Sequence, residues 1–467
     1  MTTNMKTRII AVITLAAVVA AACTKENVSA YSPETECDLT FAAGFETTRT
    51  NLAQDAGGAY TKMEWSAGDR IGVFDGSGVP QPFVTTESGA SVSFTGKADA
   101  PEGNWLAFYP YNPKATLSST GKSLITSIPE VQFARKDGVA DNVTLLVASC
   151  EADSRKFVFT QVCGLIRLEL PSGCVSVTIE NPANEKMDDN GGLTGVIGTT
   201  FGKNTAYSAG FSYSSVTLLS PDGKGLEAGN YYVAVRPVKY TGKLLLTVRR
   251  EDGHLFITEK EVSDLSVGRG QILPVKINPE WTEDDGVALY TGGTADRFAP
   301  QTNVKTSSVT ISDDERLMGR PTVRFELTSE AAWSGALIVK GDPIDVTPYG
   351  GGNYAIEYYV KCEDSALGVE GYDELFYNLI GKNNDKYYPF YRRTSGHTDR
   401  LYRGVADTLW HRMTFPLTPE MYAKVAPGGS MSKVAVGLNA KSADVSKAYK
   451  GSVMYFSNFR IVRKSGR

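Results

Sequence analysis

Short runs of apolar residues alternate with polar positions along most of this chain, and turn-forming residues separate them. From Asp38 onward the runs are rich in Val, Ile, Phe and Tyr, and Gly, Pro, Asn and Asp stand between them. Such runs predict half-buried β-strands, because successive side chains of a strand point to opposite faces. No stretch keeps the apolar i, i+3, i+4, i+7 spacing of a helix over four turns. The pattern predicts an all-β fold. The expected strands are 39–45, 70–74, 91–94, 105–109, 143–147, 156–159, 165–170, 175–179, 231–238, 243–248, 254–257, 272–277, 321–327, 355–360, 433–438 and 452–461.

One long apolar run lies at the start of the chain. Lys6 and Arg8 precede Ile9–Ala22, which carries no charge. At about 1.5 Å per residue this run spans about 21 Å, which is short of the ~30 Å hydrocarbon core of a membrane. We therefore expect residues 1–22 to be a signal peptide rather than a membrane span.

Cys23 follows this run directly and is preceded by three alanines. Small residues before a cysteine resemble a bacterial lipobox, which implies acylation of Cys23, for example by palmitate, and a lipoprotein of the outer membrane. Lys25-Glu26 resembles the charged export signal of surface lipoproteins, which implies exposure at the cell surface. The alternative is an ordinary small-residue cleavage site that happens to precede a cysteine.

Breaks in the strand pattern divide the rest of the chain. Residues 23–37 are polar and fit a tether. A break near 150–156 and a Pro-and-acid linker at 279–285 give three modules, 38–155, 156–278 and 286–467. At roughly 100–200 residues per domain, 467 residues accommodate these modules.

A series of short motifs resembles the fimbrillin-like (Mfa-like) lipoproteins over residues 38–278. The matching segments are Thr48-Arg49-Thr50, 63–74 (MEWSAGDRIGVF), 108–111 (FYPY), 128–132 (IPEVQ), 226–237 and 267–273. The resemblance implies two tandem β-sandwich domains. It also implies that a protease cutting after Arg49 would open a groove for a donor strand of another subunit. Within the motifs, Gly68-Asp69 suits a turn into strand 71–74, and we interpret Trp65 and Trp105 as core anchors rather than sugar platforms.

The C-terminal module resembles galactose-binding-like jelly-roll domains, including many carbohydrate-binding modules. The order Trp333-Ser334-Gly335, Asp345-Val346, Trp410 and the closing segment 455–461 (YFSNFRI) carries this resemblance. Ser457 stands where the pattern usually has an acid that helps to hold calcium. A single hydroxyl is a poor substitute for that ligand, so we expect no metal site.

Aromatic and basic residues are densest between Tyr372 and Tyr402. Aromatic rings stack on the apolar faces of sugars, and arginines bind hydroxyl groups, so this segment is the candidate glycan site. The candidate residues are Tyr372, Tyr387, Tyr388, Tyr391, Arg392, Arg393 and Arg400. The alternative is a sheet whose alternating tyrosines bury one face, with solvated arginines between its strands.

Composition excludes several classes of function. The 48 basic and 52 acidic residues give a net charge of −4, which does not favour nucleic acid. The chain has three histidines and shows no G-x-S-x-G, phosphate-loop or H-E-x-x-H motif, so we expect neither catalysis nor a cofactor. Beyond Cys23, the cysteines Cys37, Cys150, Cys163, Cys174 and Cys362 form no CxxC pair, and we expect mostly buried free thiols.

The sequence thus predicts a surface lipoprotein that binds glycans or host and matrix ligands through its C-terminal sandwich, by adhesion or capture. Its expected partners are the membrane, through the lipid on Cys23, and a glycan or glycoprotein. One alternative is a fimbrial accessory or tip subunit assembled by donor-strand exchange with other subunits. The other is a glycan-active enzyme.

Overall fold

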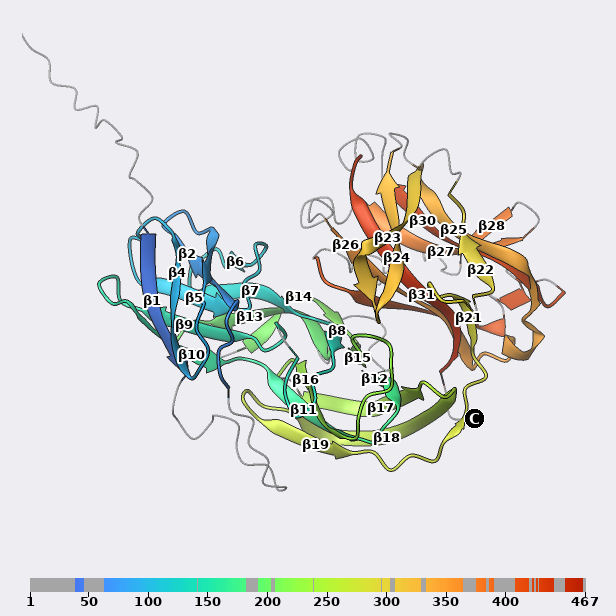
Figure 1. The fold of residues 1–467 in the computed structure, drawn as a ribbon, viewed down its shortest axis with the longest axis horizontal. Helices are drawn as coiled ribbons and strands as arrows, with labels where there is room; N and C mark the ends of the chain where they lie inside the picture. Colours follow the sequence, from blue (N-terminus) through green and yellow to red (C-terminus); the bar gives the residue numbers. More distant parts are fainter. Residues whose placement is uncertain are drawn as a thin grey trace, which may run out of the picture. The chain divides into compact units, whose positions relative to one another are not determined.

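In the computed structural model, strands follow one another from Asp38 to Arg463. The described residues are 38–45, 63–140, 142–181, 192–202, 206–237, 239–294, 296–302, 307–328, 333–363, 375–383, 386–389, 408–419, 422–423, 426, 428–440 and 450–464. Almost all regular structure in these ranges is β-strand, apart from one turn of 3-10 helix at Thr347–Tyr349 and helical residues at 419 and 422–423. The all-β prediction is confirmed (Figure 1). Within these ranges, no helix is long and apolar enough to cross a membrane.

Seven strands close into a barrel, here called the N-terminal barrel. Its strands are β1 (Asp38–Phe45), β2 (Arg70–Phe74), β3 (Pro80–Val84), β4 (Ser91–Lys97), β5 (Trp105–Tyr109), β9 (Leu146–Cys150) and β10 (Lys156–Gln161). The sequence predicts a sandwich here. Closure results because β1 pairs antiparallel with β4 and parallel with β10, which leaves no free edge.

Aromatic residues fill the barrel. Trp65 and Trp105 are 2% and 1% exposed, which confirms that both are core anchors. Trp65 stacks on Phe45, with their ring centroids 4.7 Å apart, and makes edge contacts with Phe94 and Phe159. The predicted turn at Gly68-Asp69 is also present, since Gly68 has φ +95° and the Asp69 carboxylate accepts a hydrogen bond from the Ser66 N–H at 2.8 Å.

Three further sheets form what we call the middle sandwich. One has the order β16 (Gly229–Val235), β11 (Gly164–Leu170), β19 (Ile272–Lys276). The second has the order β20 (Thr282–Glu283), β18 (His254–Ser266), β17 (Lys239–Arg250), β12 (Cys174–Glu180), β15 (Ser215–Leu219), β8 (Val131–Phe133). The third has the order β14 (Ala206–Tyr213), β13 (Thr194–Thr200), β7 (Ser123–Ile128), β6 (Thr116–Leu117).

The strand pairing links the barrel to the middle sandwich on both sides of residue 155. Strands β7 and β8 precede that residue in the chain but pair with β13 and β15 of the middle sandwich. Strand β10 follows it but belongs to the barrel. Phe74 and Phe108 of the barrel also share an apolar cluster with Leu124, Ile197 and Tyr232. The predicted module limits are therefore crossed by pairing and by packing.

The remaining strands form the C-terminal sandwich, which has two sheets. One has the order β23 (Ser307–Leu317), β24 (Arg320–Leu327), β31 (Val453–Arg463), β26 (Tyr354–Cys362), β29 (His411–Pro416), and β21 (Val287–Tyr290) also pairs with β31. The other has the order β22 (Phe298–Pro300), β25 (Trp333–Asp345), β30 (Ser430–Ala440), β27 (Leu375–Asn383), β28 (Lys386–Pro389). We call them the β26 sheet and the β30 sheet.

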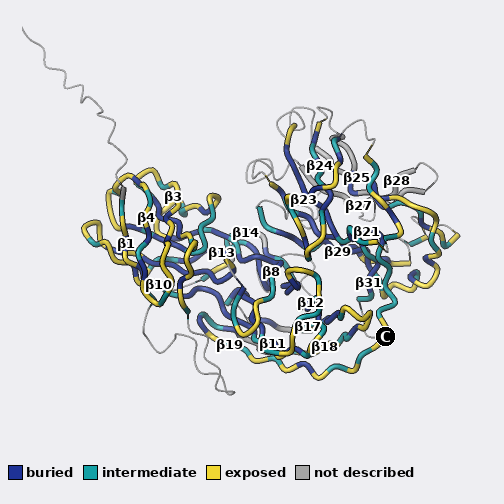
Figure 2. Tube along the Cα trace, in the orientation of Figure 1, coloured by how far each residue is buried: buried dark blue, intermediate teal, exposed yellow. Residues whose placement is uncertain are grey.

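Strand β26 is buried on both faces. Its Ile356, Tyr358 and Val360 side chains enter the core between the two sheets. Tyr359, on the opposite face, joins another apolar cluster outside that core. Strand β31 beside it is also buried along most of its length, whereas β23, at the edge of the sheet, has several exposed residues (Figure 2). A strand with two buried faces needs a partner on each, and the second partner of β26 is the middle sandwich.

Four described cysteines, Cys150, Cys163, Cys174 and Cys362, are buried thiols that form no disulfide, which confirms the expectation for these residues. Cys37 lies outside the described residues.

Candidate functional site

The outer face of the β26 sheet packs on the middle sandwich through a small apolar cluster. Val131 and Leu219 of the middle sandwich contact side chains of the C-terminal sandwich. The C-terminal residues of this cluster are Leu317, Tyr359, Trp410, Val453 and Tyr455. Most of them are nearly inaccessible to solvent. The two sandwiches are thus joined by apolar packing, which favours a fixed arrangement.

Beside this cluster, Arg412 of β29 joins acidic groups from two sandwiches. Its Nε donates to Glu357 of β26 at 2.7 Å, and its Nη1 donates to Glu180 of β12 at 3.1 Å. Its backbone N–H donates to Glu130 at 3.2 Å. Lys464 Nζ reaches the other oxygen of Glu180 at 3.3 Å. A buried guanidinium that serves two carboxylates in this way fixes their relative positions.

The pKa values of these carboxyl groups follow from the pairing. Burial by itself raises the pKa of Glu180, but Lys464 and Arg412 outweigh it and lower this pKa to about 2. Burial also opposes ionisation of Glu357, yet Arg412 and Arg249 hold its pKa below the usual range. Both groups are therefore ionised at neutral pH.

The segment expected to be a linker, 279–285, is tied to both sandwiches. Strand β20 pairs with β18. The Asp284 carboxylate lies 3.3 Å from Arg249 Nε of the middle sandwich and 3.8 Å from Arg460 Nη2 of the C-terminal sandwich. The Asp285 carboxylate accepts hydrogen bonds from Tyr354, at 2.6 Å, and from Arg463.

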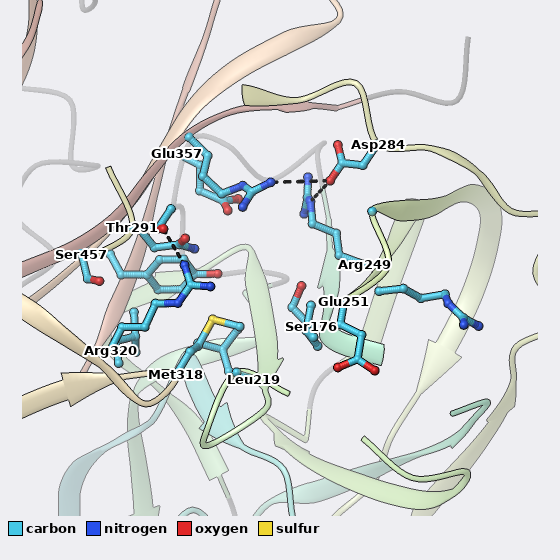
Figure 3. Close-up of a pocket in the computed structure, with 18 residues that line it drawn as sticks. Ser176, Leu219, Arg249, Glu251, Asp284, Thr291, Met318, Arg320, Glu357 and Ser457 are labelled. Atoms are coloured by element: carbon cyan, nitrogen blue, oxygen red, sulfur yellow. Dashed lines mark hydrogen bonds and ion pairs between the residues drawn. The ribbon is translucent and has the colours of Figure 1, made fainter. Parts of the chain in front are cut away.

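A cleft of about 260 Å³ opens where these elements meet (Figure 3). The ends of β12 and β17 and the β17–β18 turn line it from the middle sandwich, and β24, β26 and β31 line it from the C-terminal sandwich. Its described charged lining residues are Arg249, Arg250, Arg320 and Arg460 together with Glu251, Asp284 and Glu357. Leu219 and Met318 supply an apolar patch on one wall.

Several of these charged groups already have partners inside the protein. Arg320 Nη1 donates to Thr291 Oγ1 at 2.5 Å, and Glu251 accepts the Gly225 N–H at 2.6 Å. Arg250 lies over the ring of Trp281 at 5.0 Å. These contacts hold the side chains in place at the rim of the cleft, which favours binding of a ligand with little reordering.

A larger cavity, of about 410 Å³, lies on the barrel near Trp65, Tyr109 and Arg135. Its rim includes Met63 and Glu64. Residues 46–62, which precede Met63, lie outside the described part of the chain.

The residues that the sequence proposed for glycan binding fall mostly outside the described part. Tyr372, Tyr391, Arg392, Arg393 and Arg400 lie outside it. Tyr387 and Tyr388 lie in β28, where their backbones pair with Lys382 and Gly381 of β27. Strand β28 is the last strand of the β30 sheet, which is the sheet that does not carry the interface cluster.

The proposed lipidation site, Cys23, and the proposed cleavage site, Arg49, also lie outside the described residues. Ser457 is 1% exposed and lines the cleft. Among the described residues, no group of three or more His, Cys, Asp or Glu side chains could hold a metal ion.

Sequence reasoning did not single out the interface charges. Glu357 lies within the apolar run Ala355–Val360, and Glu180 directly follows the expected strand 175–179. A charge at such a position is a signal, because a strand buried on both faces tolerates a charge only when it is paired. That signal identifies the residue but does not identify its partner.

Comparison with known proteins gave structural neighbours alone. No protein-family model matches this chain, and no curated protein matches it. A candidate cell adhesion protein from Bacteroides ovatus ATCC 8483 is similar over 53% of this chain and 95% of its own, with 15% identity and a TM-score of 0.34. One from Bacteroides uniformis ATCC 8492 is similar over 51% and 92%, with 14% identity and a TM-score of 0.31.

Carbohydrate-binding modules are also among the structural neighbours. The C-terminal family 22 module of Clostridium thermocellum Xyn10B is similar over 38% of this chain and 92% of its own, with 11% identity and a TM-score of 0.22.

Proposed function

We propose that this chain is a lipid-anchored protein of the bacterial cell surface that captures glycans or host and matrix ligands without catalysing a reaction. Its lipid would be carried by Cys23, and its ligand would be held by the C-terminal sandwich. The observation that carries the proposal is the arginine-lined cleft between β24, β26, β31 and the middle sandwich.

The chemistry of the cleft suits the binding of a polar, oxygen-rich ligand. Guanidinium groups offer several N–H donors in a fixed plane, and these match hydroxyl and carboxylate oxygens. Asn458, which is half-buried, adds an amide on the same wall. Met318, which is half-buried, offers apolar surface to the C–H face of a sugar ring.

The carboxyl groups of the cleft favour binding over glycan hydrolysis. A glycosidase needs one carboxyl group that stays protonated so that it can act as a general acid. Arginines hold the pKa of Glu357 below its usual range, which is the opposite requirement. Asp284 lies between Arg249 and Arg460, so its negative charge is already engaged.

The contact between the β26 sheet and the middle sandwich leaves the β30 sheet as a second surface for ligands. The β26 sheet uses its outer face for the contact with the middle sandwich. Strand β28, which carries Tyr387 and Tyr388, ends the other sheet. The aromatic segment between Tyr372 and Tyr402 is therefore a second candidate site, separate from the cleft.

A glycan array probed with the full chain, purified in detergent, tests the proposal. We expect binding to a defined set of glycans or to mucin. Arg320→Gln should weaken it if the cleft is used, and Tyr387→Ala should weaken it if the β28 edge is used. Arg324→Gln is the matched control, because Arg324 lies in the same strand as Arg320 but pairs with Glu326 away from the cleft.

Two results would contradict the proposal. One is the absence of binding to every glycan, mucin and matrix protein on the array. The other is release of reducing sugar from a bound polysaccharide, which would establish an enzyme.

A further inference from the structure

The positive charge of the cleft is only partly neutralised. Arg249 and Arg460 share one carboxylate, that of Asp284. Glu357 lies near both arginines, which help to lower its pKa, but its hydrogen bond is with Arg412, which does not line the cleft. Burial and the adjacent Arg249 lower the pKa of Arg460, as expected where two guanidinium groups face each other with too few anions between them.

Two hydrogen-bond donors in this part of the cleft also lack an acceptor. Arg249 Nε and Arg460 Nε are buried and donate to no atom of the described residues. The contact between Arg249 Nε and Asp284 is an ion pair whose geometry does not make a hydrogen bond. Arg249 is only 8% exposed, so water hardly reaches it. A buried donor with no acceptor costs free energy, more so when it is charged.

An anionic ligand group would supply both missing features, since it brings negative charge and several acceptor oxygens. The volume of about 260 Å³ lies just under the range typical of drug-sized ligands, roughly 300–1,000 Å³. One sugar residue with its substituent therefore suits the cleft better than a long chain does.

We propose that the cleft binds the anionic group of an acidic saccharide, a uronate carboxylate or a sulfate ester, between Arg249 and Arg460, with Arg320 at the rim. This inference rests on the proposed function and names the class of glycan. The ligand's oxygens accept from the two Nε–H groups and offset the charge that Asp284 leaves unbalanced.

Calorimetric titration of the full chain in detergent tests this inference with three probes of similar length. They are an oligogalacturonate, a heparin-derived sulfated oligosaccharide and a neutral cello-oligosaccharide. We expect one or both acidic probes to bind at least tenfold more tightly than the neutral one. Their affinity should fall as sodium chloride is raised from 50 to 200 mM, because salt screens the attraction. The two acidic arms distinguish a carboxylate from a sulfate ligand.

The variants locate the site. Arg460→Gln and Arg320→Gln should each weaken acidic-probe binding by about tenfold, as expected for loss of a hydrogen bond from a charged group. Arg324→Gln should leave it unchanged. Urea unfolding of each variant checks that the fold is retained, and Arg460→Lys offers a second variant that keeps the charge while removing the Nε–H donor.

The outcomes separate the two proposals. If the array yields neutral glycans alone, or if Arg460→Gln binds acidic probes as the wild type does, the anionic cleft is wrong while glycan capture stands. If inorganic sulfate binds in an Arg460-dependent way but no saccharide does, the anion site stands and glycan capture fails.

Discussion

Gly223 and Gly319 bring two turns from different sandwiches into backbone contact. A Cβ atom on Gly223 would lie 2.6 Å from the carbonyl oxygen of Met318, and one on Gly319 would lie 2.8 Å from the carbonyl oxygen of Asp222. Both glycines also have positive φ, +73° and +70°. The contact therefore requires glycine twice, for its backbone angle and for its lack of a side chain.

Gly319→Ala should lower the free energy of unfolding by about 2–4 kcal/mol, because it adds a steric overlap at the interface to the cost of positive φ. Gly121→Ala is the matched control, since Gly121 has φ +67° but open space around it. It should cost about 1–2 kcal/mol. Urea unfolding of both variants measures the difference, and equal losses would mean that the two turns do not hold the sandwiches together.

Arg412→Met should destabilise the protein by about 3–5 kcal/mol, because it leaves the buried carboxylates of Glu180 and Glu357 without their shared partner. Arg324→Met, which removes a half-exposed pair with Glu326, should cost about 0–1 kcal/mol. Chemical denaturation gives both values. A loss no larger for Arg412→Met than for Arg324→Met would show that this network does not hold the interface.

Stability should fall in acid through Glu180. Its pKa in the folded chain is about 2, below the ordinary 4.5, so the unfolded chain binds the proton more readily. The stabilisation is complete above about pH 4.5 and is lost as pH falls toward 2. Urea midpoints measured from pH 7 to pH 3 should show this decline. Glu180→Gln should be less stable at pH 7 and should decline less, and a parallel decline would assign the acid sensitivity to other groups.

Buried thiols should resist alkylation while the chain is folded. Burial raises the pKa values of Cys163 and Cys174 to about 11, so very little thiolate forms at pH 8. Peptide mapping after iodoacetamide should find both unmodified in buffer and modified in urea. Cys150, which is 9% exposed, should react before them. Rapid native labelling of Cys163 would contradict this packing.

The proposed anchor makes a separate prediction. Cells expressing the chain should incorporate a labelled fatty acid into it, and Cys23→Ser should abolish the label and release the protein from the membrane fraction. Protease added to intact cells should remove the wild-type protein if it faces outward. Retained label in Cys23→Ser would place the lipid elsewhere or exclude it.

Local elements could be predicted from the sequence because their causes are local. The turn at Gly68-Asp69 needs a glycine with positive φ, and strand β2 follows from its own apolar residues. The burial of Trp65 and Trp105 follows from their size and setting.

Barrel closure and the interface depend on residues far apart in the chain. Closure needs β1 to pair with β10, which begins at Lys156. The network on Arg412 joins Glu130, Glu180 and Glu357, which come from separate strands and loops. The local sequence around each of these residues does not identify its partner, so the interface that they form could not be derived either.

The segment that carries Asp284 and Asp285 has a mechanical consequence. In the proposed arrangement the protein is anchored to the cell near its N-terminus and binds a surface through its C-terminal sandwich. Tension between the cell and that surface would then pull on this segment. A free hinge would simply swing under that tension. Here strand β20, the Asp284 ion pairs and the Arg463–Asp285 bond must break first, together with the Arg412 network. We expect the joint to resist stretching until these contacts fail together, so the ligand would be presented at a constant angle under load.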